Sequence, residues 1–223
     1  MKISASLLDA SARISSVDNL NQTGISYLHI DVMDGKMVDN IQFQDMDEIK
    51  SISNLSRFKL QIHLMVEDVS SYLDRFIGFN IESITFHLET KQDILENIQR
   101  IHDMGYRCGI AICPDTDIQD IYPYLDKIDM ILLMSVIPGR GGQSFILDTK
   151  DKIAMLKNYI DKNQLSVLIE VDGGINDKTI SLVKDADVAA ESSAYIKAQI
   201  LQQASASLLA TANQTPSIAL NLI

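Results

Sequence analysis

Two histidines and two aspartates lie at the ends of three β-rich segments. His29 and Asp31 occupy alternate positions of one segment, His63 lies near the end of a second, and Asp172 ends a third. Alternate side chains of an extended strand point to the same face, so His29 and Asp31 share a face. A single inward His or Asp is more often a hydrogen-bonded structural residue. Four such groups at one level of three strands instead predict a site for one divalent metal, with ligands that suit Zn²⁺, Fe²⁺, Mn²⁺ or Co²⁺ better than Ca²⁺.

The apolar residues of the same segments support this orientation. They alternate with the polar set and are typical of a face that packs against helices: Ile30, Val32, Ile62, Leu64 and Val171. The polar set must then point the other way. Met33, Met65 and Met134 lie near the strand ends on the polar face, where they would either fill the core or form an apolar lining beside the metal.

Three polar or glycine-rich loops follow the later strands. The first is Pro138–Gln143, in which Gly139, Gly141 and Gly142 surround Arg140. The second is Asp172–Gly174, shortly before a helix that Asn176 could cap, and the third is Glu191–Ser193. Glycine lets backbone N–H groups crowd around an anion, so the loops predict a phosphate site, with plain turns as the alternative.

Alternating β-rich and helical segments must position these residues. We expect eight strands, at Lys2–Leu8, Tyr27–Met33, Phe58–Met65, Ser83–Leu88, Arg107–Cys113, Asp129–Val136, Val167–Val171 and Asp187–Ala190. The clearest helix runs from Thr90, its expected N-cap, to Met104, and another covers about 148–162. Eight short units that close on themselves form a (β/α)8 barrel, whose catalytic residues lie at the carboxyl ends of the strands.

The main alternative fold is an open, doubly wound sheet, but no GxGxxG motif follows the first strand. The length of 223 residues suits a single barrel domain. From about Gln203 the chain should form the last helix and then, over 211–223, a loosely held tail.

Composition narrows the function classes. The net charge of −11 disfavours nucleic acid and anionic membranes as partners, and no apolar run reaches 18 residues. The first ten residues lack the apolar core of a signal peptide, so we expect a cytoplasmic protein. Cys108 and Cys113 would point to opposite faces of one strand, which predicts two reduced, buried thiols.

Several of these segments resemble the ribulose-phosphate 3-epimerase family. The matching segments, in the order of the family, are Ser6–Leu8, His29–Gly35, His63–Val66, His87–Glu89, Met134–Gly139, Gly141–Phe145 and Glu170–Gly174. The resemblance spans Ile3 to about Ile196, and the segments that begin at His29 and Met134 are long and specific. It implies a phosphate-binding (β/α)8 barrel, one divalent metal ion and a ketose phosphate substrate. We also expect a homo-oligomer, either a dimer or a hexamer.

The resemblance also implies roles for particular residues. The metal ligands would be His29, Asp31, His63 and Asp172, and Asp31 and Asp172 would also transfer the proton at carbon 3. Ser6, His63 and Asp172 would contact the substrate, whose phosphate would lie on Gly139, Arg140, Gly141, Gly142, Gly173, Gly174, Ser192 and Ser193. Met33, Met65 and Met134 would line the reacting carbon. His87 and Glu89 are expected to support the site, and His102 to lie on the surface of a helix.

Four positions depart from the family pattern. Ala5 and Asp39 replace prolines, Arg140 replaces an aromatic residue, and Ser192, after Glu191, replaces a glycine. The last two lie where phosphate is expected to bind, so the substrate is less defined than the chemistry. The leading hypothesis is a metal-dependent epimerase of D-ribulose 5-phosphate and D-xylulose 5-phosphate that acts through an enediolate. The alternatives are an epimerase of a six-carbon ketose phosphate such as D-allulose 6-phosphate, a non-catalytic sugar-phosphate-binding barrel, and a metal hydrolase.

Overall fold

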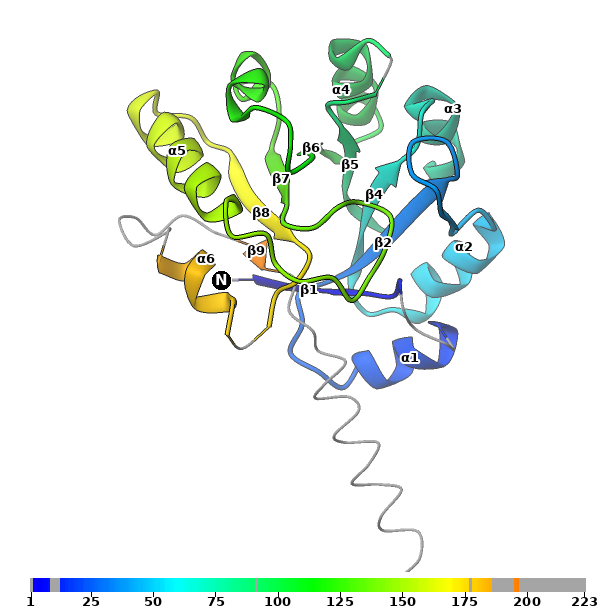
Figure 1. Ribbon diagram of the computed structural model, residues 1–223. Helices are drawn as coiled ribbons and strands as arrows, with labels where there is room; N and C mark the ends of the chain where they lie inside the picture. Colours follow the sequence, from blue (N-terminus) through cyan, green and yellow to red (C-terminus); the bar gives the residue numbers. More distant parts are fainter. Residues whose placement is uncertain (1, 9–12, 91, 177, 186–194, 197–223) are drawn as a thin grey trace, which may run out of the picture.

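A ring of parallel strands surrounded by helices forms the fold (Figure 1). The computed structural model describes residues 2–8, 13–90, 92–176, 178–185 and 195–196. Its strands are β1 (Lys2–Ser6), β2 (Tyr27–Asp34), β3 (Ile41–Gln42), β4 (Lys59–Met65), β5 (Ile81–His87), β6 (Arg107–Ile112), β7 (Met130–Met134), β8 (Leu168–Asp172) and β9 (Tyr195–Ile196). Its α-helices are α1 (Arg13–Leu20), α2 (Met46–Leu55), α3 (Val69–Leu73), α4 (Ile94–Asp103), α5 (Thr149–Lys162) and α6 (Ile180–Asp185).

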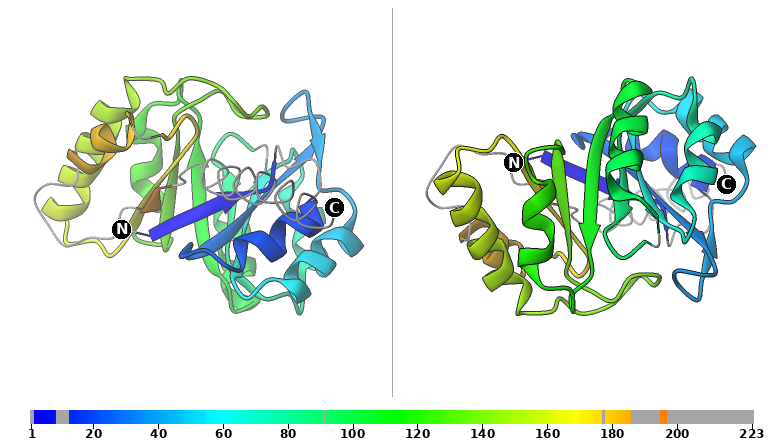
Figure 2. Two further views of the ribbon diagram at one scale, coloured as in Figure 1. Left: turned by 90° about the horizontal axis from the view of Figure 1, so that it is seen from below. Right: turned by 90° about the horizontal axis from the view of Figure 1, so that it is seen from above.

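The strands pair in the order β1-β9-β8-β7-β6-β5-β4-β2, and a β1–β2 pairing closes the ring. Each of these pairings is parallel, as short βα units require. The perpendicular views of Figure 2 show the helices outside the strands. The fold is therefore a TIM-type barrel, as the sequence predicts.

Two layers of apolar side chains pack this barrel. The main core lies between strands and helices and includes Ile30, Val32, Ile62, Leu64 and Val171. A small inner cluster consists of Ala111, Leu132, Met134 and Val136. The expected alternation between the two faces of the strands is thereby confirmed.

Helix α4 begins later than the sequence analysis predicts. Thr90 was the expected N-cap, whereas the Asp93 carboxylate accepts hydrogen bonds from the backbone N–H groups of Leu95 and Glu96. Thr and Asp are both good caps, and the apolar spacing that begins at Ile94 is satisfied by either start. The helix predicted at about 148–162 is confirmed as α5. Asn176 Oδ1 accepts the N–H groups of Lys178 and Thr179, in the turn that leads into α6.

Other connections differ from a uniform βα repeat. The connection between β6 and β7 is a 3-10 helix over Ile118–Tyr124 that contains Pro123, which lacks the N–H that an α-helix would need. A second 3-10 turn, Asp74–Phe76, follows α3. The short strand β3 is antiparallel to β2. The predicted strand Asp187–Ala190 and tail 211–223 lie outside the described residues, and β9 pairs with both β8 and β1.

Two loops meet over the carboxyl ends of the strands. The loop after β7, green in Figure 1, crosses the ring toward the loop after β2. There the Asn40 side-chain amide donates a hydrogen bond to the Gly139 carbonyl at 3.0 Å. In the part of the chain that the structure describes, none of the helices is long and apolar enough to cross a membrane.

Candidate active site

Strand register brings the predicted metal ligands together. Asp31 of β2 and His63 of β4 are direct partners in the parallel ladder, and Ser6 of β1 is the partner of His29. Asp172 comes from β8, which is separated from β2 in the ring by β1 and β9. His29, Asp31, His63 and Asp172 each place one ligand atom within 4.8 Å of the others. All four predicted ligands thus lie in one group that could hold a metal ion.

The closest contacts within this group converge on one carboxylate. Asp31 Oδ1 lies 3.0 Å from His29 Nε2 and 3.1 Å from His63 Nδ1. Asp172 Oδ2 lies 3.6 Å from the same His63 nitrogen. The other oxygen of Asp31 accepts a hydrogen bond from the Ser6 hydroxyl at 2.8 Å. Two imidazole nitrogens and two carboxylates form a donor set that suits a divalent transition-type metal.

Burial separates the two aspartates. The side chain of Asp31 is 5% exposed and that of His63 is fully buried, whereas the side chain of Asp172 is 16% exposed. The cluster is thus closed toward β2 and β4 and more open toward β8. A small molecule that enters the mouth would therefore meet Asp172 first.

Further polar groups lie deeper in the barrel. Gln61 and Glu170 precede His63 and Asp172 by two residues and belong to the same inward face. The Gln61 amide donates to Glu170 Oε2 at 3.3 Å, and both side chains are buried. This hydrogen-bonded pair forms a polar layer beneath the metal-ligand layer.

A second polar group lies beside the first. His87 is completely buried, and its Nδ1 lies 3.1 Å from Glu89 Oε2. Cys113 Sγ lies 3.6 Å from the same nitrogen, and these three residues also form a group that could hold a metal. The expected supporting position of His87 and Glu89 agrees with this geometry. Cys108 and Cys113 are free thiols as predicted, although Cys113 is only half-buried.

Burial, hydrogen bonds and nearby charge shift the pKa values of this second group. Burial opposes ionisation of Glu89, but hydrogen bonds from His87, Thr116 and the Cys113 N–H outweigh it and lower its pKa to about 2. Burial also lowers the pKa of His87 below its usual value. Burial and the charge of Glu89 raise the pKa of Cys113 to about 12, so its thiol is protonated at neutral pH.

The loops after β7 and β8 lie against each other. Gly139, Gly142, Gly173 and Gly174 all have positive φ, from 62° to 106°. A Cβ at Gly173 would lie 2.3 Å from Val136 Cγ2, and one at Gly174 would lie 2.5 Å from the Phe145 backbone nitrogen. Only glycine allows this close backbone approach.

Ser135 links the end of β7 to the end of β8, and no sequence motif predicts this role. Its hydroxyl contacts the carbonyls of Asp172 and Gly173, at 2.8 and 2.6 Å, while its N–H donates to the Asp172 carbonyl. The only sequence signal is a serine directly after an apolar strand. This serine holds the backbone of Asp172, and through it the carboxylate, at the end of β8.

Arg140 extends from a loop whose shape does not depend on its side chain. The Gln143 amide donates to the carbonyls of Ile137 and Arg140, and Asn40 holds the carbonyl of Gly139. Arg140 itself is exposed. Glu191, Ser192 and Ser193 lie outside the described residues.

The three predicted lining methionines are buried near the cluster level. Met33 and Met65 are register partners on β2 and β4, and Met134 is the partner of Asp172. His102, by contrast, is exposed on α4 as expected, with Nε2 2.9 Å from Asp129 Oδ2.

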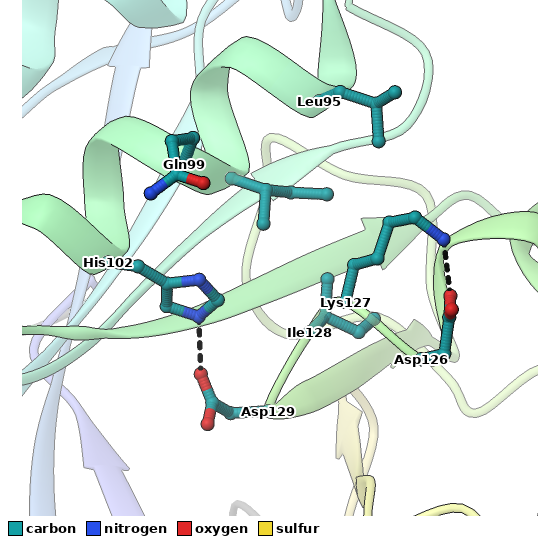
Figure 3. Close-up of a pocket in the computed structure, with 8 residues that line it drawn as sticks. Leu95, Gln99, His102, Asp126, Lys127, Ile128 and Asp129 are labelled. Atoms are coloured by element: carbon teal, nitrogen blue, oxygen red, sulfur yellow. Dashed lines mark hydrogen bonds and ion pairs between the residues drawn. The ribbon is translucent and has the colours of Figure 1, made fainter.

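A hollow of about 510 Å³ lies on the outside of the barrel, between α4 and the segment before β7 (Figure 3). Its lining includes Leu95, Gln99, His102, Lys127 and Asp129. Asp129 directly precedes the first residue of β7, so this hollow lies at the opposite strand ends from the His/Asp cluster. It is therefore separate from the candidate active site.

Comparison with known proteins agrees with this geometry. The profile of the ribulose-phosphate 3 epimerase family matches residues 2–195. The ribulose-phosphate 3-epimerase of Bacillus subtilis (strain 168) is 34% identical over 189 residues, which cover 83% of this chain and 87% of that protein. The protein of the same name from Chlamydia pneumoniae is 37% identical, over 75% of this chain and 73% of its own length.

Solved structures of lower identity share the fold. The N-terminal domain of a putative aldolase from Bacteroides vulgatus has a TM-score of 0.60 at 16% identity, over 89% of this chain and 72% of that one. Phosphoribosyl anthranilate isomerase from Thermococcus kodakaraensis has a TM-score of 0.58 at 10% identity, over 88% and 87% of the two chains. The family profile and the curated relatives show that this chain belongs to the ribulose-phosphate 3-epimerase family and is an isomerase of the epimerase type.

Proposed function

We propose that the chain is a metal-dependent 3-epimerase that interconverts D-ribulose 5-phosphate and D-xylulose 5-phosphate. The observation that carries this proposal is the convergence of His29, Asp31, His63 and Asp172 within 4.8 Å at the mouth of the barrel. A divalent cation in this cluster would supply positive charge near the sugar oxygens, which stabilises the negative charge that develops when a carbon beside a ketone loses a proton. We propose Zn²⁺, Fe²⁺, Mn²⁺ or Co²⁺ as that ion.

The two aspartates would move the proton. One carboxylate takes the proton from carbon 3, and the bonding electrons remain on the sugar as an enediolate. The other aspartate, initially protonated, delivers its proton to the opposite face of carbon 3. Asp31 and Asp172 come from different strands of the ring, which suits attack on two faces of one carbon. Each turnover exchanges their protonation states, so water must exchange a proton with them before the next one.

We assign the remaining predicted residues to substrate binding. Ser6, which donates to Asp31, and His63 would contact the sugar. The phosphate would lie on the loops after β7 and β8, where positive-φ glycines bring backbone N–H groups together. Arg140 and the serines at 192 and 193 would complete this site.

A six-carbon ketose phosphate such as D-allulose 6-phosphate is the second candidate substrate. Arg140 favours it, because this exposed cation stands where the family has an aromatic residue and it can reach a phosphate at a different distance from the cluster. The reaction would be the same at carbon 3. The expected single barrel domain, cytoplasmic location and dimeric or hexameric assembly also remain proposals.

Isotope exchange in D₂O tests this function. An epimerase would place solvent deuterium at carbon 3 of the product and of recovered substrate. A non-catalytic binder would leave both unlabelled, and a hydrolase would release phosphate without labelling carbon 3. A panel of ketose 5- and 6-phosphates would identify the substrate by its kcat/KM, and a higher value for a six-carbon sugar would overturn the pentose assignment.

A further inference from the structure

A row of hydrogen-bonding groups leads from the proposed metal site to the rim of the barrel. His63 Nδ1 faces Asp31, while its other ring nitrogen, Nε2, lies 3.0 Å from His87 Nε2. His87 Nδ1 in turn lies 3.1 Å from Glu89 Oε2. Both imidazoles are completely buried. Their nitrogens must therefore interact with protein groups: the neighbours in the row and, for His87 Nδ1, also Cys113 Sγ at 3.6 Å.

The outer end of the row determines where the protons lie. An ionised carboxylate only accepts hydrogen bonds, so Glu89 requires the proton of His87 on Nδ1. Nε2 of a neutral His87 is then an acceptor, and His63 must donate to it from Nε2. The lone pair of His63 is left on Nδ1, which points at Asp31 and Asp172.

The metal site at the inner end of the row requires the same placement of protons for a separate reason. A metal held by the cluster needs the lone pair of His63 at Nδ1, because that nitrogen is the one near the carboxylates. The proton of His63 is then on Nε2. His87 Nε2 must therefore be unprotonated, and the proton of His87 must lie on Nδ1, facing Glu89. One arrangement of protons satisfies both ends of the row.

Glu89 is itself held in place. Its Oε1 accepts the Cys113 N–H at 2.8 Å and the Thr116 hydroxyl. Lys152 of α5 donates to the carbonyls of Pro114 and Thr116, which holds this loop against the helix. The carboxylate that orients His87 is thus held by the loop after β6, which α5 holds in turn.

We propose that Glu89 and His87 are positioning residues that hold His63 in the tautomer with an unprotonated Nδ1, which can then bind a metal ion. This inference rests on the metal site proposed above. Outer groups of this kind typically contribute 10- to 100-fold to metal affinity, because they fix the tautomer and orientation of a histidine ligand.

The group His87, Glu89 and Cys113 offers a competing arrangement. A metal on His87 Nδ1 would move the proton of His87 to Nε2, which would then donate to His63. The proton of His63 would be forced onto Nδ1, where it would block the first cluster. The two arrangements exclude each other, so an experiment that locates the protons distinguishes them.

Nitrogen NMR of the zinc-loaded protein locates them without any substitution. The chain has four histidines, so selective ¹⁵N labelling gives an assignable spectrum. We expect one zinc ion per chain, a proton on Nε2 of His63, and a proton on Nδ1 of His87. A proton on Nε2 of His87, or zinc bound to its Nδ1, would overturn the proposal. Wild-type protein that binds no divalent metal would refute the proposed function instead.

Substitution at His87 measures how much the row contributes. His87→Leu removes the acceptor for His63 and should weaken zinc binding roughly 10- to 100-fold in competition with a chromophoric chelator. His87→Gln can accept through its amide oxygen and should recover much of this loss. His102→Leu, on the exposed face of α4, is the matched control and should bind zinc like wild type. Unchanged zinc affinity in His87→Leu would contradict the proposal.

A second pair of variants tests the proposal even if His87→Leu does not fold. Glu89 lies at the rim with 29% of its side chain exposed, so its replacement disturbs less packing. Glu89→Leu should weaken zinc binding and mix the two tautomers of His87, whereas Glu89→Gln retains an acceptor oxygen and should stay close to wild type. A purely structural role would lower the melting temperature of the metal-free protein in Glu89→Leu but leave the tautomers as they were, and that result would also refute the proposal.

Discussion

The two sides of the barrel mouth are built by different means. On the side of β2 and β4, the site consists of buried side chains whose positions follow from strand register, as for the Asp31 and His63 partners. On the side of β7 and β8, it consists of loop backbone, with Gly173 and Gly174 at positive φ and an exposed Arg140. In the proposed site, the first side and Asp172 at the end of β8 hold a cation, and the loops of the second side bind an anion through N–H groups.

This difference separates the chemistry from the specificity. By the sequence resemblance, all four proposed ligands match the family pattern, whereas Arg140, in the loop after β7, departs from it. A buried ligand set admits few replacements, because each changes the charge or geometry at the reacting carbon. A loop can exchange side chains and alter the substrate without disturbing the proton transfer. Damage to the strand side should therefore reduce kcat, and damage to the loop side should mainly raise KM.

Metal removal should have the largest effect. Chelation is expected to abolish turnover, because without the cation the developing negative charge on the sugar is unbalanced. The far-ultraviolet circular dichroism should remain, since the apolar core between strands and helices does not include the cluster. Activity should return with Zn²⁺, Fe²⁺, Mn²⁺ or Co²⁺. Loss of secondary structure on chelation would show that the strand side is a structural metal site.

Replacing either proposed proton carrier should have the next largest effect. Asp31→Asn and Asp172→Asn should each lower kcat by at least ~10³-fold, because an amide neither carries the proton nor ligates well. Asp120→Asn removes the same charge at an exposed carboxylate that belongs to neither metal-binding group, and this variant should behave like wild type. Near-normal kcat in either active-site variant would refute the two-carboxylate mechanism.

The strand side could be predicted from the sequence, and the loop side only in outline. Period-two alternation places His29 and Asp31 on one face whatever surrounds them, because it is a property of the extended backbone. Ser135 follows Met134, the register partner of Asp172, so its contact with the Asp172 carbonyl depends on which two strands pair, and no local pattern encodes that pairing. The start of α4 was misplaced for a related reason, since the capping role of Asp93 depends on loop geometry and not on residue type alone.

A side chain at Gly173 should displace the loop after β8 and, through it, the proposed proton carrier Asp172. Gly173→Ala places a methyl group against Val136 in a backbone conformation with φ of 106°. The loop must shift, and because it follows Asp172 directly, kcat/KM should fall on the order of 10²-fold. Gly24→Ala, with no atom within 4 Å of the added Cβ, is the control and should change little.

A double variant separates the causes of the Gly173 effect. Val136→Ala removes the two Cγ atoms that the new methyl group meets at 2.3 and 2.7 Å and leaves only Cβ, at 3.0 Å. Gly173→Ala combined with Val136→Ala should therefore regain part of the lost activity. The strain of the positive φ, roughly 1–2 kcal/mol, would remain in the free energy of unfolding. A single Gly173→Ala variant with wild-type KM and kcat would show that this loop does not position Asp172 or phosphate.

Arg140 should give the smallest effect and the most informative one about substrate. Its loop is held by Gln143 and Asn40, so Arg140→Ala should leave the loop in place and remove only a cation. If that cation contacts phosphate, KM should rise about tenfold, or roughly 1.5 kcal/mol, with little change in kcat, because the phosphate is bound equally before and during proton transfer. Lys162→Ala removes an exposed positive charge at the C-terminal end of α5. This variant is the control for the change in the net charge of the protein.

Arg140→Phe then tests whether this loop selects the length of the sugar. The sequence resemblance implies an aromatic residue at this position, so Arg140→Phe should shift the ratio of kcat/KM for five- and six-carbon ketose phosphates toward the pentose. That shift would locate specificity on the loop side while the strand side stays untouched. Unchanged KM for every ketose phosphate in both Arg140 variants would show that Arg140 does not contact the substrate. The substitution at Ser192 would then be the next position to test.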